Sequence, residues 1–284
     1  MKRSVKAIVA ATCAAFLCAA PAISNVAPVI NSISASAYYI PNAYADIDHN
    51  FIATISYDHT DDQGRTIYNG CHLDYRFETL RTGESVIMVC GSDLAVSIVN
   101  VPNRVKLNGQ IYSVGGIAEG AFTDKNGTQN GQGAGLTKLI LSNATYLKEI
   151  KPNAFKNCTA LTSVDLKSGN LYWIDNSAFE NCSGITELNL PSTVREVGSY
   201  AFMNSGIKNL TFNYNSRYNL KLNQFAFGNC TSLRSIKNDN DIDYTNSSKK
   251  AFQGVNKNYI SFSTGRSTSS PYNSYVYGFI NYFF

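Results

Sequence analysis

Residues 185–206, ITELNLPSTVREVGSYAFMNSG, are one copy of a phrase that recurs from residue 136 to residue 255 of this 284-residue chain. The preceding copy, residues 161–184, reads LTSVDLKSGNLYWIDNSAFENCSG. An Ala-Phe pair marks each copy: Ala121-Phe122, Ala154-Phe155, Ala178-Phe179, Ala201-Phe202, Ala226-Phe227 and Ala251-Phe252. From Phe155 onward, these Phe residues follow one another at intervals of 24, 23, 25 and 25 residues. Self-similarity at a fixed period of about 20–50 residues is typical of a solenoid.

Each copy also opens with a short apolar motif. In Leu161-x-x-Val164-x-Leu166, the last two side chains alternate with Asp165, as in a strand with one buried face. The motif recurs at Leu136/Leu139/Leu141, Ile185/Leu188/Leu190, Ile207/Leu210/Phe212 and Leu233/Ile236. One copy alone cannot bury these side chains, whereas stacked copies place each on its equivalent in the next coil. We therefore predict adjacent parallel strands whose buried side chains include Leu161, Val164, Leu166, Ile185, Leu188 and Leu190.

The phrase resembles the BspA-like subtype of the leucine-rich repeat superfamily, whose pattern is roughly L-x-x-I-x-L-P-x-x-V-x-x-I-G-x-x-A-F-x-x-C. In residues 185–205, Ser205 occupies the position of the Cys. The other pattern positions match at Ile185, Leu188, Leu190, Pro191, Val194, Val197, Gly198, Ala201 and Phe202. The copies that begin at Leu161 and Leu233 lack the Pro. The resemblance covers roughly residue 96 to the C-terminus. It implies a leucine-rich repeat solenoid with a parallel β-sheet on the concave face and short turns or helical segments on the convex side.

The first 37 residues are typical of a secretory signal peptide. Basic residues at Lys2, Arg3 and Lys6 precede an apolar run, Ala7–Ala20, that is too short to span a bilayer comfortably. Ala35-Ser36-Ala37 then offers small residues to a signal peptidase, and a membrane anchor is the alternative. Cleavage removes three of the 24 Lys and Arg residues, which leaves 21 basic residues against 20 acidic ones. This balance gives no support for nucleic-acid binding, which needs clustered Lys and Arg.

Residues 38–95 are expected to form a β-rich N-terminal cap that covers the first coil. Residues 51–57 alternate as a strand does, and residues 73–90 predict a β-hairpin that turns at Thr82-Gly83-Glu84. The chain's three His residues, His49, His59 and His72, also fall here. Together with nearby Asp residues, they make a metal-binding or enzymatic domain the alternative. Solvated turns explain the same residues, because no H-E-x-x-H motif or EF-hand loop is present.

Three cysteines, Cys158, Cys182 and Cys230, recur at one position of the repeat. Small buried side chains explain this recurrence, because the spacing and the His partners of a zinc site are absent. A disulfide between Cys71 and Cys90 stays open as an alternative for a secreted protein. The predicted hairpin does not obviously place these two residues opposite each other.

Residues 258–284 are expected to cap the other end of repeats that span residues 96–257. Tyr259–Phe262 predicts a last strand, followed by the aromatic residues Tyr272, Tyr275, Tyr277, Phe279, Tyr282 and Phe283. The family resemblance implies a closing unit in which a short helix precedes a final strand. Burial of the rings over the last coil would close the array, and an exposed aromatic ligand patch is the alternative. The Gly- and Asn-rich insertion between Phe122 and Leu136 is another candidate binding site, because loops often carry function.

The sequence contains no phosphate-binding loop, nucleophile elbow or paired catalytic carboxylates, so we expect no catalytic residues, cofactor or metal site. The family resemblance implies a secreted or cell-surface binding or adhesion protein. We expect its partner to be an extracellular protein or glycan, with no nucleic acid, no membrane span in the mature chain and a monomeric state. A passive structural surface protein and an active domain at residues 38–95 are the alternatives.

The candidate binding face consists of the residues between the apolar positions of each strand, because these side chains point outward. They are Thr137, Lys138, Ile140, Thr162, Ser163, Asp165, Thr186, Glu187, Asn189, Lys208, Asn209, Thr211, Arg234, Ser235 and Lys237. The cations lie mainly toward the C-terminal end and the acidic residues earlier, so the charge changes sign along the face. Such a face suits a polar or charged partner better than lipid. An ordinary solvated sheet surface is the alternative.

Overall fold

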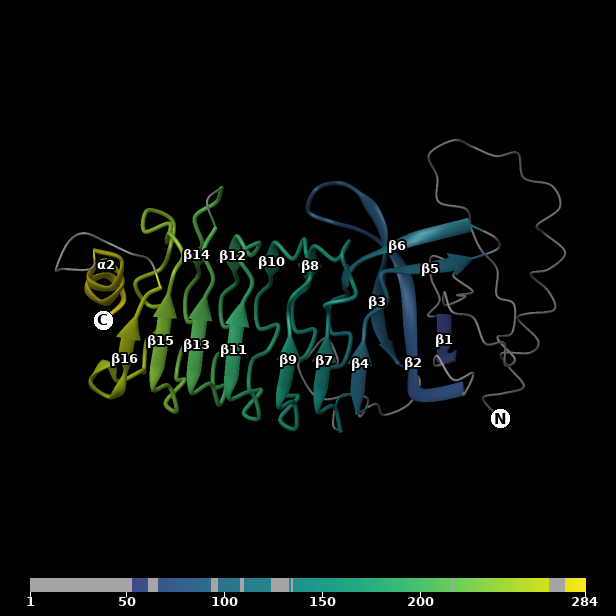
Figure 1. Cartoon of the computed structure of the whole chain (residues 1–284), viewed down its shortest axis with the longest axis horizontal. Coiled ribbons are helices and arrows are strands. Elements are labelled where there is room, and N and C mark those ends of the chain that lie inside the picture. Colours follow the sequence, from purple (N-terminus) through teal and green to yellow (C-terminus); the bar gives the residue numbers. More distant parts are fainter. Residues whose placement is uncertain are drawn as a thin grey trace, which may run out of the picture.

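The computed structural model describes residues 53–60, 66–92, 97–107, 110–123, 133, 135–215, 217–265 and 274–284. These residues form a solenoid of parallel strands, about six coils long, with little helix. Two rows of short strands run along its length (Figure 1). The predicted signal peptide, His49 and the insertion at residues 124–132 lie outside the described residues, as do the side chains of His59, His72 and Cys71.

The first row is built from the Leu-rich motifs. Its strands are β4 (Ile98–Asn100), β7 (Lys138–Ile140), β9 (Ser163–Asp165), β11 (Glu187–Leu190), β13 (Asn209–Phe212), β15 (Ser235–Asn238) and β16 (Ser261–Ser263). Burial alternates along β11, where Leu188 and Leu190 are buried while Glu187 and Asn189 are exposed. The prediction of parallel strands is confirmed, and the buried residues include Leu161, Leu166, Ile185, Leu188 and Leu190.

The first row is interrupted between β9 and β11, which divides it into two sheets. β4, β7 and β9 form one parallel sheet, and β11, β13, β15 and β16 form the other. Val164, at the centre of β9, is only partly buried and packs against the edge of the core, so its prediction as a buried residue is wrong. Strand β9 is short and ends in Asp165, a residue type depleted in strands, which fits weak pairing at this coil.

The second row comes from the smaller apolar pairs, such as Val194 and Val197. Strands β8 (Glu149–Ile150), β10 (Trp173–Ile174), β12 (Glu196–Val197) and β14 (Lys221–Leu222) pair in parallel. The same sheet continues through β6 (Gln110–Ile117), β3 (Ser85–Ser92), β2 (Thr66–Thr79) and β1 (Ala53–Thr60). The predicted hairpin is therefore confirmed as antiparallel β2–β3, and β3 joins it in parallel to β6. Strand β5 (Arg104–Leu107) pairs with β6 in antiparallel fashion.

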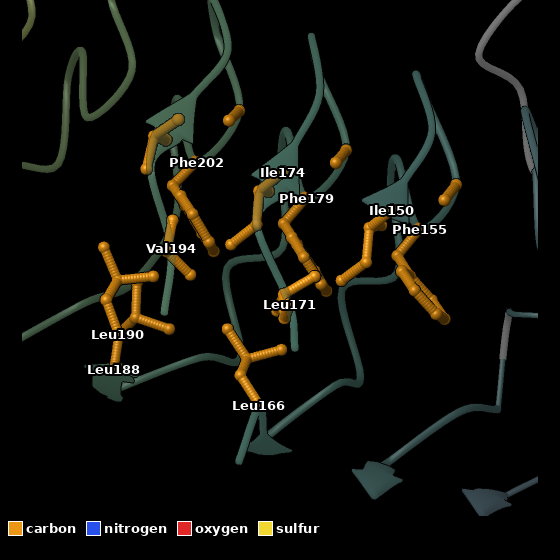
Figure 2. Close-up of a cluster of buried hydrophobic side chains, with 14 of the residues drawn as sticks. Ile150, Phe155, Leu166, Leu171, Ile174, Phe179, Leu188, Leu190, Val194 and Phe202 are labelled. Carbon is orange, nitrogen blue, oxygen red and sulfur yellow. The ribbon is translucent and has the colours of Figure 1, made fainter. Parts of the chain in front are cut away.

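A stack of phenylalanine rings fills the core between the Ala-Phe turns and the strands. Figure 2 shows Phe155, Phe179 and Phe202 in the same orientation in three successive coils. From Phe122 to Phe252, the centroids of consecutive rings lie 5.1–5.4 Å apart, with interplanar angles of 2–15°. These rings are almost completely buried. The small side chain of the Ala beside each Phe leaves room for the neighbouring coil to approach.

In each of the four Ala-Phe turns from Ala154-Phe155 to Ala226-Phe227, two residues adopt the left-handed backbone region. One precedes the pair, with φ of 55–61° at Asn153, Ser177, Tyr200 and Phe225, and the other follows, with φ of 55–66° at Asn157, Asn181, Asn204 and Asn229. Asn enters this region more readily than most residues, which explains why it recurs after the pair. The amides also connect neighbouring coils. Asn181 donates to Asn157 at 2.7 Å, and Asn204 donates to Asn181 at 2.8 Å.

The repeated cysteines are buried thiols, as predicted. The thiol of Cys182 donates to the carbonyl of Phe155 at 3.1 Å, and that of Cys230 donates to the carbonyl of Phe202 at 3.2 Å. Burial raises the pKa of the Cys182 thiol, and it raises the pKa of Cys230 to about 11. Both groups are therefore neutral at physiological pH and serve packing rather than reactivity.

The C-terminal helix α2 (Ser274–Phe283) covers the last coil. It follows the short 3-10 helix η1 (Lys257–Tyr259) and strand β16, so the family-derived order of helix before final strand is wrong. Phe279 and Phe283 lie one turn apart, are buried, and each place a ring centroid 5.4 Å from that of Phe252. The predicted burial is confirmed for Phe279 and Phe283, but it is wrong for Tyr277, which is 49% exposed because it points away from the coil, and Tyr282 is only half-buried. Tyr272 and the side chain of Tyr275 lie outside the described residues. The rings of the helix cover the end of the phenylalanine stack at Phe252.

Candidate functional site

The residues of the predicted binding face stand in register on the first row of strands. Glu187 aligns with Asn209 and Ser235, and Asn189 aligns with Thr211 and Lys237. The exposed members are Thr137, Lys138, Thr162, Ser163, Glu187, Asn189, Lys208, Asn209, Arg234 and Lys237, and the half-buried members are Ile140, Asp165, Thr186, Thr211 and Ser235. Since paired strands lie about 4.8 Å apart, the side chains form columns across neighbouring coils.

Several charges on this face are already engaged within the chain. The guanidinium of Arg234 donates to the carbonyls of Thr231 at 3.0 Å and Leu233 at 2.8 Å. Lys237 forms an ion pair with Asp239 at 3.0 Å, and Glu187 accepts a hydrogen bond from Asn209. By contrast, Lys138 and Lys208 form no ion pair within the described part of the chain. These two lysines are the cations of the face that are available to a partner.

A second cluster lies on the outer face of the second row, where three carboxylates meet one arginine. Arg81, in the turn between β2 and β3, forms ion pairs with Asp175, with Glu149 at 3.2 Å and with Glu196 at 3.4 Å. The backbone N–H of Arg81 also donates to Glu149 at 3.3 Å. The three acids belong to successive coils, so the cluster binds the N-terminal hairpin to three coils at once. We call it the Arg81 cluster.

The protonation of the Arg81 cluster is unusual because one guanidinium faces three carboxyl groups. Burial raises the pKa of Asp175 to about 7, with nearby Glu149 adding to the effect and Arg81 opposing it. Burial also acts to raise the pKa of Glu196, but hydrogen bonds from Asn223 and Lys221 outweigh it and hold that pKa below its ordinary value. A proton is therefore retained at Asp175 near neutral pH.

The Arg81 cluster joins the N-terminal hairpin to the coils, and its carboxyl groups are mostly shielded from solvent. Paired carboxyls also occur at acid–base catalytic sites, but Glu149 and Asp175 are only 2% and 5% exposed and the turn carrying Arg81 covers them. Sequence reasoning missed this cluster because Arg81 and Glu149 are 68 residues apart. The available signal was that Glu149 and Glu196 occupy the same register position on either side of Trp173.

The described residues contain no group of three or more His, Cys, Asp or Glu side chains placed to hold a metal ion. An open depression of about 490 Å³ lies at the C-terminal end, between residues 252–258 and the last two phenylalanines. Its lining contains no acidic residue, His or Cys. In the part of the chain that the structure describes, every helix is too short or too polar to cross a membrane.

Two family models match separate parts of this chain. A model of the leucine-rich repeat matches residues 134–194. A model of the BspA-type leucine-rich repeat region, which holds six copies, matches residues 216–277. No curated protein matches the chain.

Three solved structures are similar to parts of this chain. A leucine-rich repeat protein from Bacteroides ovatus ATCC 8483 is 22% identical, with a TM-score of 0.46, over 58% of this chain and 45% of that one. The T. pallidum leucine-rich repeat protein is 18% identical, with a TM-score of 0.45, over 57% of this chain and 68% of that one. A leucine-rich cell surface protein from Faecalibacterium prausnitzii A2-165 is 18% identical, with a TM-score of 0.34, over 66% and 55%. This chain spans less than half the length of the Bacteroides ovatus protein.

Proposed function

Since residues 134–194 and 216–277 are leucine-rich repeats, the second stretch of the BspA type, we propose that this chain is a non-enzymatic binding or adhesion protein. Its partner is an extracellular protein or glycan, bound on the outward face of the first row of strands. The observation that carries the proposal is the register of that face, in which polar side chains repeat in columns from coil to coil. Repeat solenoids use such extended surfaces for binding.

The same proposal places the protein outside the cytoplasm. The basic start, the apolar run and Ala35-Ser36-Ala37 support cleavage that leaves Tyr38 as the first residue of the mature chain. In this organisation, residues 38–95 form the N-terminal cap, residues 96–257 the repeats and residues 258–284 the C-terminal cap. The cap also continues the second row, because β3 pairs with β6. A functional role of residues 38–95 is therefore best tested by replacing single residues, because deletion of this segment removes part of the sheet.

The test begins with a pull-down of the mature chain, residues 38–284, against cell-envelope and host extracellular components. Glu187→Lys and Lys208→Glu then reverse two exposed charges on the first row. Lys250→Glu, an exposed residue of the Ala251-Phe252 turn rather than of a first-row strand, is the matched control. We expect the two face variants to weaken binding of the captured partner and the control to bind as the parent does. If both face variants fold normally and bind with the parent's affinity, the first row is not the site.

A further inference from the structure

One edge of the solenoid is formed by turns that carry tyrosine and basic residues but no acidic residue of their own. It is formed by the turns that lead from the first row to the second, residues 141–148, 166–172, 190–195 and 212–220 (Figure 1). These turns contain Tyr146, Lys148, Lys167, Tyr172, Arg195, Tyr214, Arg217 and Tyr218 and neither Asp nor Glu. The next turn, residues 238–243, contains three Asp residues. We call the four acid-free turns, together with Arg104, the tyrosine–arginine edge.

Arg195 is held between two tyrosine rings from neighbouring coils. Its guanidinium carbon lies 4.1 Å from the ring centroid of Tyr172 and 3.7 Å from that of Tyr218. Both distances are well within the range of a favourable cation–π contact. The three side chains belong to three successive coils, so the stack fixes the position of the guanidinium along the edge. Such fixing lowers the entropy lost when the group binds a ligand.

The charge of Arg195 is not neutralised within the described part of the chain. Arg195 has no ion pair there, its side chain makes no hydrogen bond, and its buried Nε lacks an acceptor. Three neighbouring cations, by contrast, have acidic partners. Arg81 meets three carboxylates, Lys148 pairs with Glu84, and Lys221 pairs with Glu196. A half-buried guanidinium that is rigidly placed and lacks a counter-ion is suited to binding an anion from outside.

The edge extends beyond Arg195 in both directions. Toward the N-terminus, Arg104 donates to the hydroxyl of Tyr146 and lies 4.9 Å from its ring centroid. Tyr146 and Tyr218 are 37% and 43% exposed, so the edge is accessible at both ends of this row. Three steps of about 4.8 Å separate their coils, which gives a row roughly 14 Å long. The row therefore fits an elongated ligand better than a single small anion.

We propose that the tyrosine–arginine edge binds an acidic polysaccharide, with Arg195 holding a carboxylate or sulfate group of the sugar chain. Arg is the residue type best matched to such planar or multi-oxygen anions. The rest of the edge carries amide and hydroxyl groups, such as those of Asn143, Asn170 and Asn215. Groups of this kind form hydrogen bonds with the hydroxyl groups of sugars. An acidic peptide shares the negative charge but lacks the ring of hydroxyl groups that these amides suit, and the test below separates the two. This site is separate from the proposed first-row face.

Isothermal titration calorimetry on the mature chain tests the proposal with four probes. Heparin oligosaccharides supply sulfate, and polygalacturonate oligomers supply carboxylate. Dextran is the neutral sugar control, and poly-glutamate is the acidic peptide control. We expect binding of at least one acidic polysaccharide, weakened at high ionic strength, and no binding of dextran. Poly-glutamate that binds as tightly as the sugars would replace the polysaccharide with a peptide partner and overturn the proposal, as would failure of both acidic sugars to bind.

The affinities of single-residue variants show where on the molecule the polysaccharide binds. Arg195→Gln should weaken the acidic polysaccharide at least about tenfold, since a charge-assisted hydrogen bond is lost. Arg195→Lys should give an intermediate loss, because it keeps the charge but loses the planar fork and the ring stacking. Lys257→Gln removes the same charge away from the edge and should bind as the parent does. Unchanged affinity in Arg195→Gln would overturn the proposal.

Three further variants distinguish loss of the site from misfolding and from binding at the first row. Arg217→Gln lies on an exposed part of the same edge and should cause a smaller loss without affecting folding, so it decides the matter if Arg195→Gln does not fold. Unchanged affinity in that variant as well would place the ligand elsewhere. Glu187→Lys and Lys208→Glu should leave polysaccharide affinity within about twofold of the parent. If these first-row variants abolish it instead, the sugar binds the first row and not the edge.

Discussion

Replacing Phe179 by Ala removes one ring from the centre of the phenylalanine stack. Phe179 is 0% exposed, and its ring centroid lies 5.1 Å from those of both Phe155 and Phe202, with interplanar angles of 10° and 3°. Loss of a buried Phe costs about 3–5 kcal/mol, through lost burial and the cavity left behind. Two aromatic neighbours place this site in the upper part of that range, because each ring pair contributes about 0.5–1.5 kcal/mol beyond its buried area. We therefore expect a loss of about 4–5 kcal/mol.

Urea unfolding of residues 38–284, followed by far-UV circular dichroism, measures this cost from the shift in midpoint at constant slope. Tyr259→Ala is the control, because this ring is 67% exposed and should cost less than about 1 kcal/mol. Because each coil contacts only its neighbours, the damage should begin at the coils on either side of Phe179. Hydrogen exchange should therefore accelerate first in residues 150–210. A cost for Phe179→Ala as small as that of the control would show that the rings do not carry the stacking of the coils.

The folded-state pKa of Asp175 is about 7, above its ordinary 3.8, so its contribution to stability is present below about pH 4 and is lost as pH rises to about 7. The parent should therefore melt at a lower temperature at pH 8 than at pH 5, and Asp175→Asn should lose much less over that interval; equal losses in both proteins would contradict the assignment. Asn181→Ala should cost about 1–3 kcal/mol in urea unfolding, because Ala pays the left-handed penalty and breaks two amide hydrogen bonds. Asn181→Gly should cost less because Gly avoids that penalty, and a larger cost for Gly would refute the reasoning. Cys182 and Cys230 should resist iodoacetamide in the folded protein and react after denaturation, as mass spectrometry would show; rapid labelling of the native chain would place them at the surface.

The stacked coils and the buried face of each strand could be predicted from the sequence. The Ala-Phe pairs recur every 23–25 residues, and the Leu-rich motifs keep the same period. A solenoid places equivalent positions in equivalent surroundings, so the buried residue in one coil predicts the buried residue in the next. The same logic identified the outward positions of the first row, which the structure places in register. Their use in binding remains a proposal.

Only the tertiary structure determines which groups of the same chain those outward residues contact. The sequence pattern places Arg234 on the first-row face, but its guanidinium bonds to carbonyls of its own coil. The pattern gives no sign that β9 and β11 fail to pair, nor that α2 follows the last strand to close the stack at Phe252. These features depend on the lengths and paths of individual coils, which differ among copies that share one apolar pattern.

The two clusters of charged side chains illustrate the same division. Arg81 meets acids from three coils because β3 pairs with β6 and brings the hairpin turn over the second row. Arg195 lies between Tyr172 and Tyr218 because three turns of different sequence come together on one edge. Periodicity in a sequence determines which side chains are buried, since burial repeats with the coil. The contacts of these charged side chains do not repeat from coil to coil, so only the folded arrangement of the coils determines them.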